Sequence, residues 1–137
     1  MTEFISFKTL KRPLKPNTYL LAPPNLCLAA EPDAAPPFFS NSPRGLFSQL
    51  SEIIAAERSW GDVIADTEAL RLKFVARTAL MRFKDDIDIM IIAPDAQANS
   101  GESGTTLAIY SRSRVGYSDL GANKKRVDQI IAKLTAK

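Results

Sequence analysis

The side chains best suited to bind a ligand lie in one polar stretch, from residue 111 to residue 126. The stretch begins Ser111-Arg-Ser-Arg114, continues through a turn bounded by two glycines, and ends Asn123-Lys-Lys-Arg126 where an amphipathic segment starts. Guanidinium groups beside the free N–H groups of a helix N-terminus suit a carboxylate or a phosphate. We therefore predict an anion-binding corner formed by six residues: Arg112, Arg114, Ser118, Asp119, Asn123 and Arg126.

A structural role for the same corner stays open. Residues 124–126 are all basic, and basic groups are unfavourable in the first turn of a helix unless a negative charge compensates the helix dipole. Asp119 is the simplest compensating group. Arg114 or Arg126 would then only tie Asp119 and turn carbonyls together.

Three aspartates at the start of a predicted strand are the candidates for acid–base or metal chemistry: Asp85, Asp86 and Asp88. Adjacent residues of a strand point to opposite faces, so that at most Asp86 and Asp88 converge. Arginines nearby would keep both carboxylates ionised. We expect cross-strand ion pairs here, and no catalytic residue is predicted.

The predicted register of the last two strands supports this expectation. Pairing the apolar residues Ile91 with Leu107 and Ile89 with Ile109 places Asp86 opposite Arg112 on an antiparallel neighbour. A slip of one residue would turn every apolar side chain to the other face, so the pattern forbids it.

Two absences in the composition limit the possible chemistry. The chain has no histidine and a single cysteine, Cys27. The commonest general base and metal ligand is therefore missing, and neither an intrachain disulfide nor a Cys-rich zinc site can form. We expect no metal site, no cofactor and a function that is not enzymatic.

The net charge and the hydropathy of the chain limit the classes of partner that it can bind. The net charge is only +3, without the dense Lys/Arg stripes and stacking aromatics of nucleic-acid-binding proteins. No apolar run approaches the roughly 20 residues of a membrane span. We expect a soluble protein with no classical signal peptide as written. It would be either cytoplasmic or a processed periplasmic or plastid form. Peripheral association with a membrane complex stays open.

Hydrophobic periodicity predicts an α+β domain over residues 43–137. Helices are expected at 43–58, where Ser42 is a plausible N-cap and Pro43 the first residue, and at 123–136. Between them, alternation predicts strands near 63–66, 69–77, 87–93 and 105–114. Short connections favour a four-stranded antiparallel sheet with both helices packed on one face.

The first 42 residues are expected to form an extended, irregular arm. Eight of the nine prolines lie within residues 1–43, which excludes regular helix and central strand. The arm also carries large apolar side chains that a disordered linker would lack. We predict that these side chains dock on the domain or on a protein partner: Tyr19, Leu20, Phe38 and Phe39.

The order of motifs resembles one known family. The motif Ser111-Arg-Ser-Arg114, followed by Gly116-Tyr-Ser-Asp119, Gly121-Ala-Asn123 and Arg126, is similar to the hallmark of the family named domain of unknown function 1499. Arg12-Pro and Pro16-Asn-Thr-Tyr-Leu20 resemble its N-terminal arm, and Phe83-Lys-Asp-Asp86 resembles its central block. The resemblance implies occurrence in bacteria, cyanobacteria and plant plastids, but no activity, cofactor or catalytic residue.

Two functions follow from these observations, with an enzyme as a third. The first is a non-enzymatic accessory or interaction protein, for example an auxiliary subunit of a larger, membrane-associated assembly, with a protein partner held by the arm. The alternative is a small binding module for an anionic ligand at the Arg114–Arg126 corner.

Overall fold

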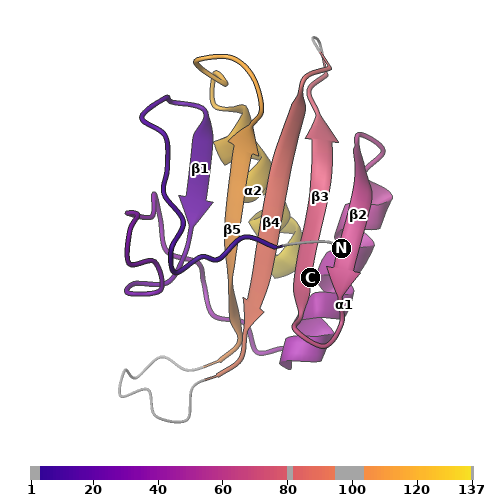
Figure 1. The fold of residues 1–137 in the computed structure, drawn as a ribbon. Coiled ribbons are helices and arrows are strands. Elements are labelled where there is room, and N and C mark those ends of the chain that lie inside the picture. Colours follow the sequence, from indigo (N-terminus) through magenta and orange to yellow (C-terminus); the bar gives the residue numbers. More distant parts are fainter. Residues whose placement is uncertain (1–3, 80–81, 95–103, 137) are drawn as a thin grey trace.

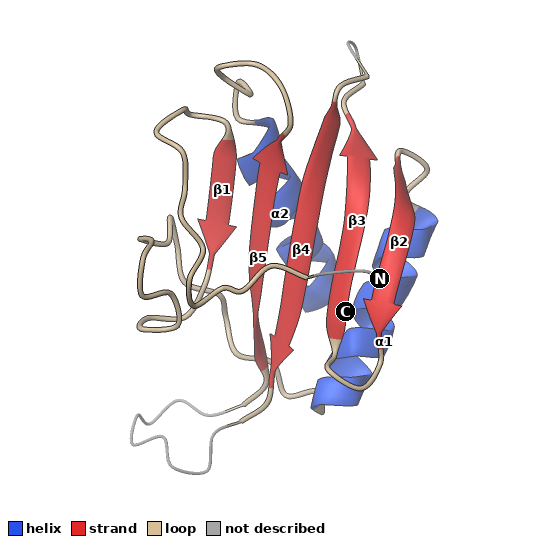
Figure 2. Cartoon of the chain, viewed as in Figure 1, coloured by secondary structure: helices blue, strands red, loops and turns tan. Residues whose placement is uncertain are grey.

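The chain folds into one antiparallel sheet with two helices behind it, as the computed structural model shows (Figures 1 and 2). The structure describes residues 4–79, 82–94 and 104–136. In chain order the elements are β1 (Thr18–Leu21), α1 (Pro43–Ala56), β2 (Trp60–Asp66), β3 (Arg71–Arg77), β4 (Lys84–Ile92), β5 (Thr106–Ser113) and α2 (Ala122–Thr135). The sheet order is β1-β5-β4-β3-β2.

The α+β class, the antiparallel pairing and the two helices on one face of the sheet are confirmed. The prediction of four strands is wrong, because the sheet has five. The fifth, β1, comes from the segment expected to be an irregular arm. It occupies the proline-free window between Pro16 and Pro23 and pairs with β5, Thr18 opposite Arg112 and Leu21 opposite Ile109.

Proline density excluded a central strand but not an edge strand, and β1 lies at the sheet edge. Backbone pairing with β5 thus ties residues 18–21 to the sheet formed by the rest of the chain. The boundary between an arm at 1–42 and a domain at 43–137 stays a prediction.

The register of the central hairpin is as predicted. In the β4–β5 pair, Ile89 lies opposite Ile109, and Asp86 lies opposite Arg112. Strand residues two apart share a face, so β5 turns Leu107, Ile109 and the following odd-numbered residues toward the helices. The even-numbered residues of β5 face the other side of the sheet.

Each face of the sheet is covered. On the helix face, Ile89, Ile109, Leu50 and Ile130 belong to the main core and are fully buried. On the other face, the chain before β1 lies across the sheet, and Phe7 and Leu10 pack with Leu20 and Tyr110 in a second apolar cluster. Burial on both faces leaves the ends of the strands as the places where polar groups gather.

The start of α1 shows how the local sequence positions a helix. The Ser42 hydroxyl accepts a hydrogen bond from the N–H of Gly45 at 3.0 Å, and Pro43 occupies the first helical position, as predicted. One apolar stripe, which includes Leu46, Leu50 and Ile54, then packs on the sheet.

Candidate functional site

Three segments meet at one end of the sheet, at the top of Figure 1, and we call this region the loop end. It consists of residues 10–17, residues 82–84 and the β5–α2 connection, residues 114–121. Backbone contacts join them: the Arg114 N–H donates to the Lys84 carbonyl at 3.2 Å, and the Asp119 N–H to the Pro16 carbonyl at 3.3 Å. The predicted corner lies here.

Arg112 and Arg114 lie on the sheet face opposite the helices, where each already binds an aspartate. Arg112 Nη1 lies 2.9 Å from Asp88 Oδ2. Arg114 binds both oxygens of Asp86, through Nε and Nη2 at 2.8 Å each. The hydrogen bonds from Arg114 hold the pKa of the Asp86 carboxyl below its usual value. Asp86 and Asp88 are thus both engaged in ion pairs, with Arg114 just after β5 and with Arg112 near its end.

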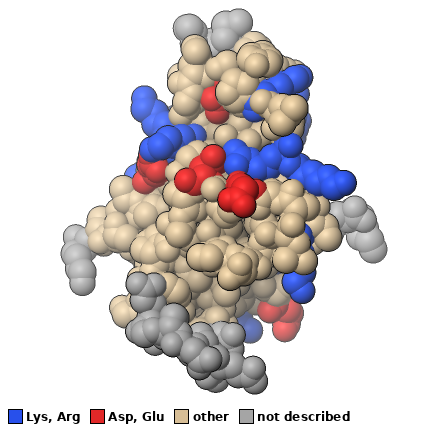
Figure 3. Space-filling view, turned by 90° about the vertical axis from the view of Figure 1, so that its left-hand side faces the viewer, with Lys and Arg blue, Asp and Glu red and all other residues tan. Residues whose placement is uncertain are grey.

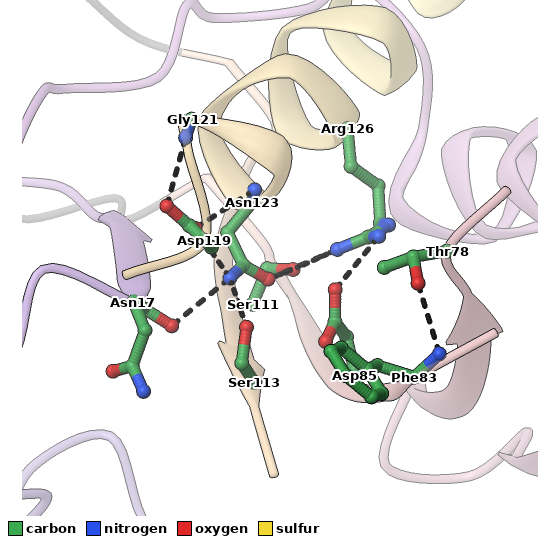
Figure 4. A network of polar contacts seen from close by, with 10 residues as sticks. All are labelled: Asn17, Thr78, Phe83, Asp85, Ser111, Ser113, Asp119, Gly121, Asn123 and Arg126. Atoms are coloured by element: carbon green, nitrogen blue, oxygen red, sulfur yellow. Dashed lines mark hydrogen bonds and ion pairs between the residues drawn. The ribbon is translucent and has the colours of Figure 1, made fainter. Parts of the chain in front are cut away.

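Asn123 and Arg126 lie on the helix face instead, in a buried polar network (Figure 4). The Asn123 amide donates to the Asn17 carbonyl at 2.9 Å and to Ser113 Oγ at 3.0 Å, and Asn123 Oδ1 accepts from Ser111 at 2.6 Å. Arg126 Nη1 donates to Ser111 Oγ at 3.0 Å and to Asn123 Oδ1 at 2.9 Å. The network fastens the first turn of α2 to β5 and to the residue before β1.

Asp85 faces this network from β4. Its side chain is 1 % exposed, and its Oδ2 lies 2.9 Å from Nη2 of Arg126, which is itself 8 % exposed. Burial raises the pKa of the Asp85 carboxyl, and the charge of Arg126 partly offsets that rise. Neither carboxylate oxygen accepts a hydrogen bond of good geometry from the described residues, although Ser113 stands close. The attraction of opposite charges at 2.9 Å holds this pair together.

The side chain of Asp119 caps the start of α2. Asp119 Oδ1 accepts the N–H of Gly121 at 2.9 Å, and Oδ2 accepts the N–H of Asn123 at 3.1 Å. Gly121 adopts the left-handed conformation at the cap, with φ of 84°. Ser118 Oγ accepts the Leu120 N–H at 3.2 Å within the same turn. The compensating role proposed for Asp119 toward the basic first turn agrees with this geometry.

The structure therefore divides the six predicted residues between two faces of the sheet. Arg112 and Arg114 point to one face, while Asn123 and Arg126 lie against the other, next to Ser113. Because these residues are close in sequence, they were predicted to form a single corner. The faces differ because α2 packs on the side of the odd-numbered residues of β5, whereas Arg112 and Arg114, which directly follows the strand, are even-numbered.

Sequence reasoning missed four members of the network: Asp85, Ser111, Ser113 and Asn17. The available indication was the alternation of β4, which puts Asp85 on the same face as Ile87 and Ile89. Likewise Ser111 continues the buried row of Leu107 and Ile109. Asn17 carried no such pattern, because nothing local predicts that it lies beside α2.

The side chains predicted to dock on the domain or on a partner have different surroundings. Leu20 and Phe39 are buried in the cores of this chain, and Tyr19 is partly buried against the main core. Phe38 is largely exposed. A direct contact of Leu20 or Phe39 with a partner would need the fold to open, whereas docking through Phe38 stays a prediction.

The loop end also encloses a pocket of about 260 Å³. Phe83, Val115 and Leu120 form apolar walls, and Asp85 and Asp119 are the charged residues among those that line the pocket. Within residues 4–79, 82–94 and 104–136, no three His, Cys, Asp or Glu side chains are grouped so as to hold a metal ion. Of the helices that the structure describes, neither is long and apolar enough to cross a membrane.

Residues 11–134 match the family model described as "Protein of unknown function (DUF1499)", and the chain belongs to this family. Comparison with curated proteins and with solved structures found no match.

Proposed function

We propose that this protein is a non-enzymatic accessory or interaction protein, an auxiliary subunit that docks on a larger assembly through the loop end. One observation carries the proposal. Nine large hydrophobic side chains are exposed among the described residues, and five of them belong to the loop end: Leu14, Phe83, Val115, Tyr117 and Leu120. Scattered single apolar residues are normal on a surface, but a group on three joined loops is typical of an interaction site.

The charges around these side chains favour an acidic partner surface. Lys15 and Lys84 are exposed beside Leu14 and Phe83, and neither forms an ion pair with a described residue. Figure 3 shows that Lys and Arg on one side of the molecule lie mainly in its upper half, the half that leads to the loop end, with Asp and Glu among them. Opposite charge on the partner would speed association and set its orientation.

The alternative, an anion-binding module at the predicted corner, has less support. The planar fork of Arg114 is occupied by Asp86, and Arg126 is buried against Asp85, Ser111 and Asn123. An anion would have to displace carboxylates that already neutralise these groups. For an enzyme, no observation favours a particular reaction.

Paired charge-introducing variants test the docking role. Leu120→Asp places a carboxylate on the loop end, at a side chain that is 95 % exposed, and Leu28→Asp is the matched control at a 76 % exposed side chain in the arm. Both variants should keep the wild-type melting temperature, because neither side chain is buried. Each tagged protein is then purified from native membrane and soluble extracts, and the partners are quantified by mass spectrometry.

We expect Leu120→Asp to lose specific partners that wild-type protein and Leu28→Asp both retain. A photo-crosslinking residue at position 117 should join the same partners, whereas one at position 28 should not. Equal recovery of all partners by both variants would refute docking through the loop end.

A further inference from the structure

The net positive charge of the chain is concentrated in the loop end. Its three segments, residues 10–17, 82–84 and 114–121, contain six basic residues and one acidic residue, Asp119, which gives a net charge of +5. The whole chain has a formal net charge of +3, so that the rest of the chain is net −2. This asymmetry creates a field that attracts an anionic surface to one end of the molecule.

Two neighbouring cations at this end of the sheet have no acidic partner. Lys84 at the start of β4 lies directly opposite Arg77 at the end of β3, and the backbone N–H of Arg114 donates to the Lys84 carbonyl. Arg114 is neutralised by Asp86, whereas neither Arg77 nor Lys84 forms an ion pair with a described residue. Like charges directly opposite each other destabilise a sheet. An external anion would relieve this repulsion.

Exposed apolar side chains lie on the same loops. Leu14 and Leu120 are the two most exposed large hydrophobic side chains among the described residues. Leu120 lines one pocket with Phe83 and Val115, Leu14 lines a second, and Asp119 belongs to the lining of both. On the side drawn in Figure 3, Lys and Arg, with Asp and Glu among them, form a belt below an uppermost surface made mainly of other residues. Apolar tips beside a basic belt suit the interface of a membrane, where lipid phosphates lie above the acyl chains.

The kinds of apolar side chain distinguish between anionic partners. A nucleic acid would need aromatic rings on which its bases stack, and the three segments contain only two, Phe83 and Tyr117. Leu14, Val115 and Leu120 are aliphatic, and aliphatic side chains gain free energy by leaving water for the acyl boundary of a bilayer. The nearly complete exposure of both leucines also means that they protrude, which suits insertion into a soft bilayer better than a fit to a rigid protein surface.

We propose that the loop end binds the surface of an anionic lipid bilayer. Leu14 and Leu120 insert at the level of the headgroups, while Lys15, Lys84 and Arg77 bind lipid phosphates. The strands then run away from the membrane, because the loop end lies at one end of the sheet. The inference rests on the proposed role of the loop end as a docking surface, and it names the lipid surface of a membrane-associated assembly as what this end docks on.

Cosedimentation of the isolated protein with vesicles tests the proposal. Vesicles made of equal parts of phosphatidylglycerol and phosphatidylcholine should bind the protein at least about ten-fold more tightly than vesicles of phosphatidylcholine alone. Raised salt should weaken the binding, because it screens exposed charges. Equal binding to both kinds of vesicle, or binding to neither, would refute the proposal.

Apolar variants test insertion. Leu120→Asp places a charge among the lipid headgroups and should weaken binding to the anionic vesicles at least about ten-fold, whereas Leu28→Asp, at an exposed side chain outside the loop end, should leave it nearly unchanged. Equal vesicle binding by these two variants would overturn the assignment to the loop end.

Basic variants test the contact with phosphates. Joint replacement of Lys15 and Lys84 by Gln should weaken vesicle binding about ten-fold or more, since each basic residue near an anionic surface contributes several-fold. Joint replacement of Arg44 and Lys133 by Gln removes the same charge at exposed positions outside the loop end and should change the binding less than about two-fold. Equal losses in the two double variants would show that net charge alone attracts the protein, and would overturn the site.

Two further outcomes separate the possible partners. Single-stranded DNA of mixed sequence bound as tightly as the anionic vesicles, by wild-type protein and Leu120→Asp alike, would overturn the lipid assignment. A protein that binds no vesicle, but loses specific protein partners through Leu120→Asp, would refute this inference and keep the docking role. Vesicle binding that depends on Leu120, with equal recovery of protein partners by all variants, would keep this inference and refute docking on a protein.

Discussion

Replacement of Asn123 by Ala should destabilise the fold more than its polar character suggests. The carboxamide is fully buried and forms five side-chain hydrogen bonds, at 2.6–3.0 Å, that join α2 to β5, to the preceding loop and to the residue before β1. A typical hydrogen bond contributes about 1 kcal/mol net to stability. The full set therefore bounds the loss at about 5 kcal/mol.

The structure lowers that bound, because most partners retain another bond. Ser111 and Arg126 still bind each other, and Asp119 still accepts the N–H groups of Gly121 and of residue 123. The Asn17 carbonyl still accepts the N–H of residue 113 at 3.0 Å. Ala also has a helix propensity better by roughly half a kilocalorie than Asn. We expect a net loss of about 2–3 kcal/mol in the free energy of unfolding.

Urea unfolding measures this loss through the fluorescence of Trp60, the single tryptophan, whose ring packs at 5.0 Å from that of Phe74. Lys125→Ala is the control, since that side chain is exposed on the same helical turn and its loss should change stability by less than about 0.5 kcal/mol. If Asn123→Ala lost no more than Lys125→Ala, the network would not hold α2 in place, and the reasoning above would be refuted.

Two further predictions concern the core and the adjacent aspartates. Ile109→Ala removes a fully buried side chain and should cost about 2–5 kcal/mol in urea unfolding, whereas Ile64→Ala, at a partly exposed position, should cost less than about 1 kcal/mol. Carboxyl ¹³C NMR should find the pKa of Asp86 below, and that of Asp85 above, the ordinary value of 3.8. Asp86 thus contributes stability that is present above the ordinary pKa and is lost as pH falls through its folded pKa. Asp85 contributes stability that is fully present below the ordinary pKa and is lost as pH rises through its folded pKa. Shifts in the same direction for both groups would contradict the opposite environments of the two faces.

Local patterns in the sequence were enough to predict much of this fold. Ser42 and Pro43 mark the start of α1 because the cap needs only a side-chain oxygen and a fixed φ within one turn. The register of β4 against β5 followed from matching Ile89 with Ile109, since a slip by one residue would expose the whole apolar row. A helix cap and a strand register depend on residues close together in the chain, so the hydrophobic pattern of the sequence predicts them directly.

Only the tertiary structure decided which face of the sheet each polar group at the loop end lies on. Alternation places Arg112, and Arg114 just after β5, on one face of the sheet, but it does not say which face a helix will cover. Packing of α2 on the other face separated them from Arg126 and brought Asp85 to it instead. Asn17, 106 positions before Asn123, completes the network only because β1 joins the sheet edge. Contacts between such distant positions depend on the burial of all the elements together, which leaves no periodic trace in the sequence.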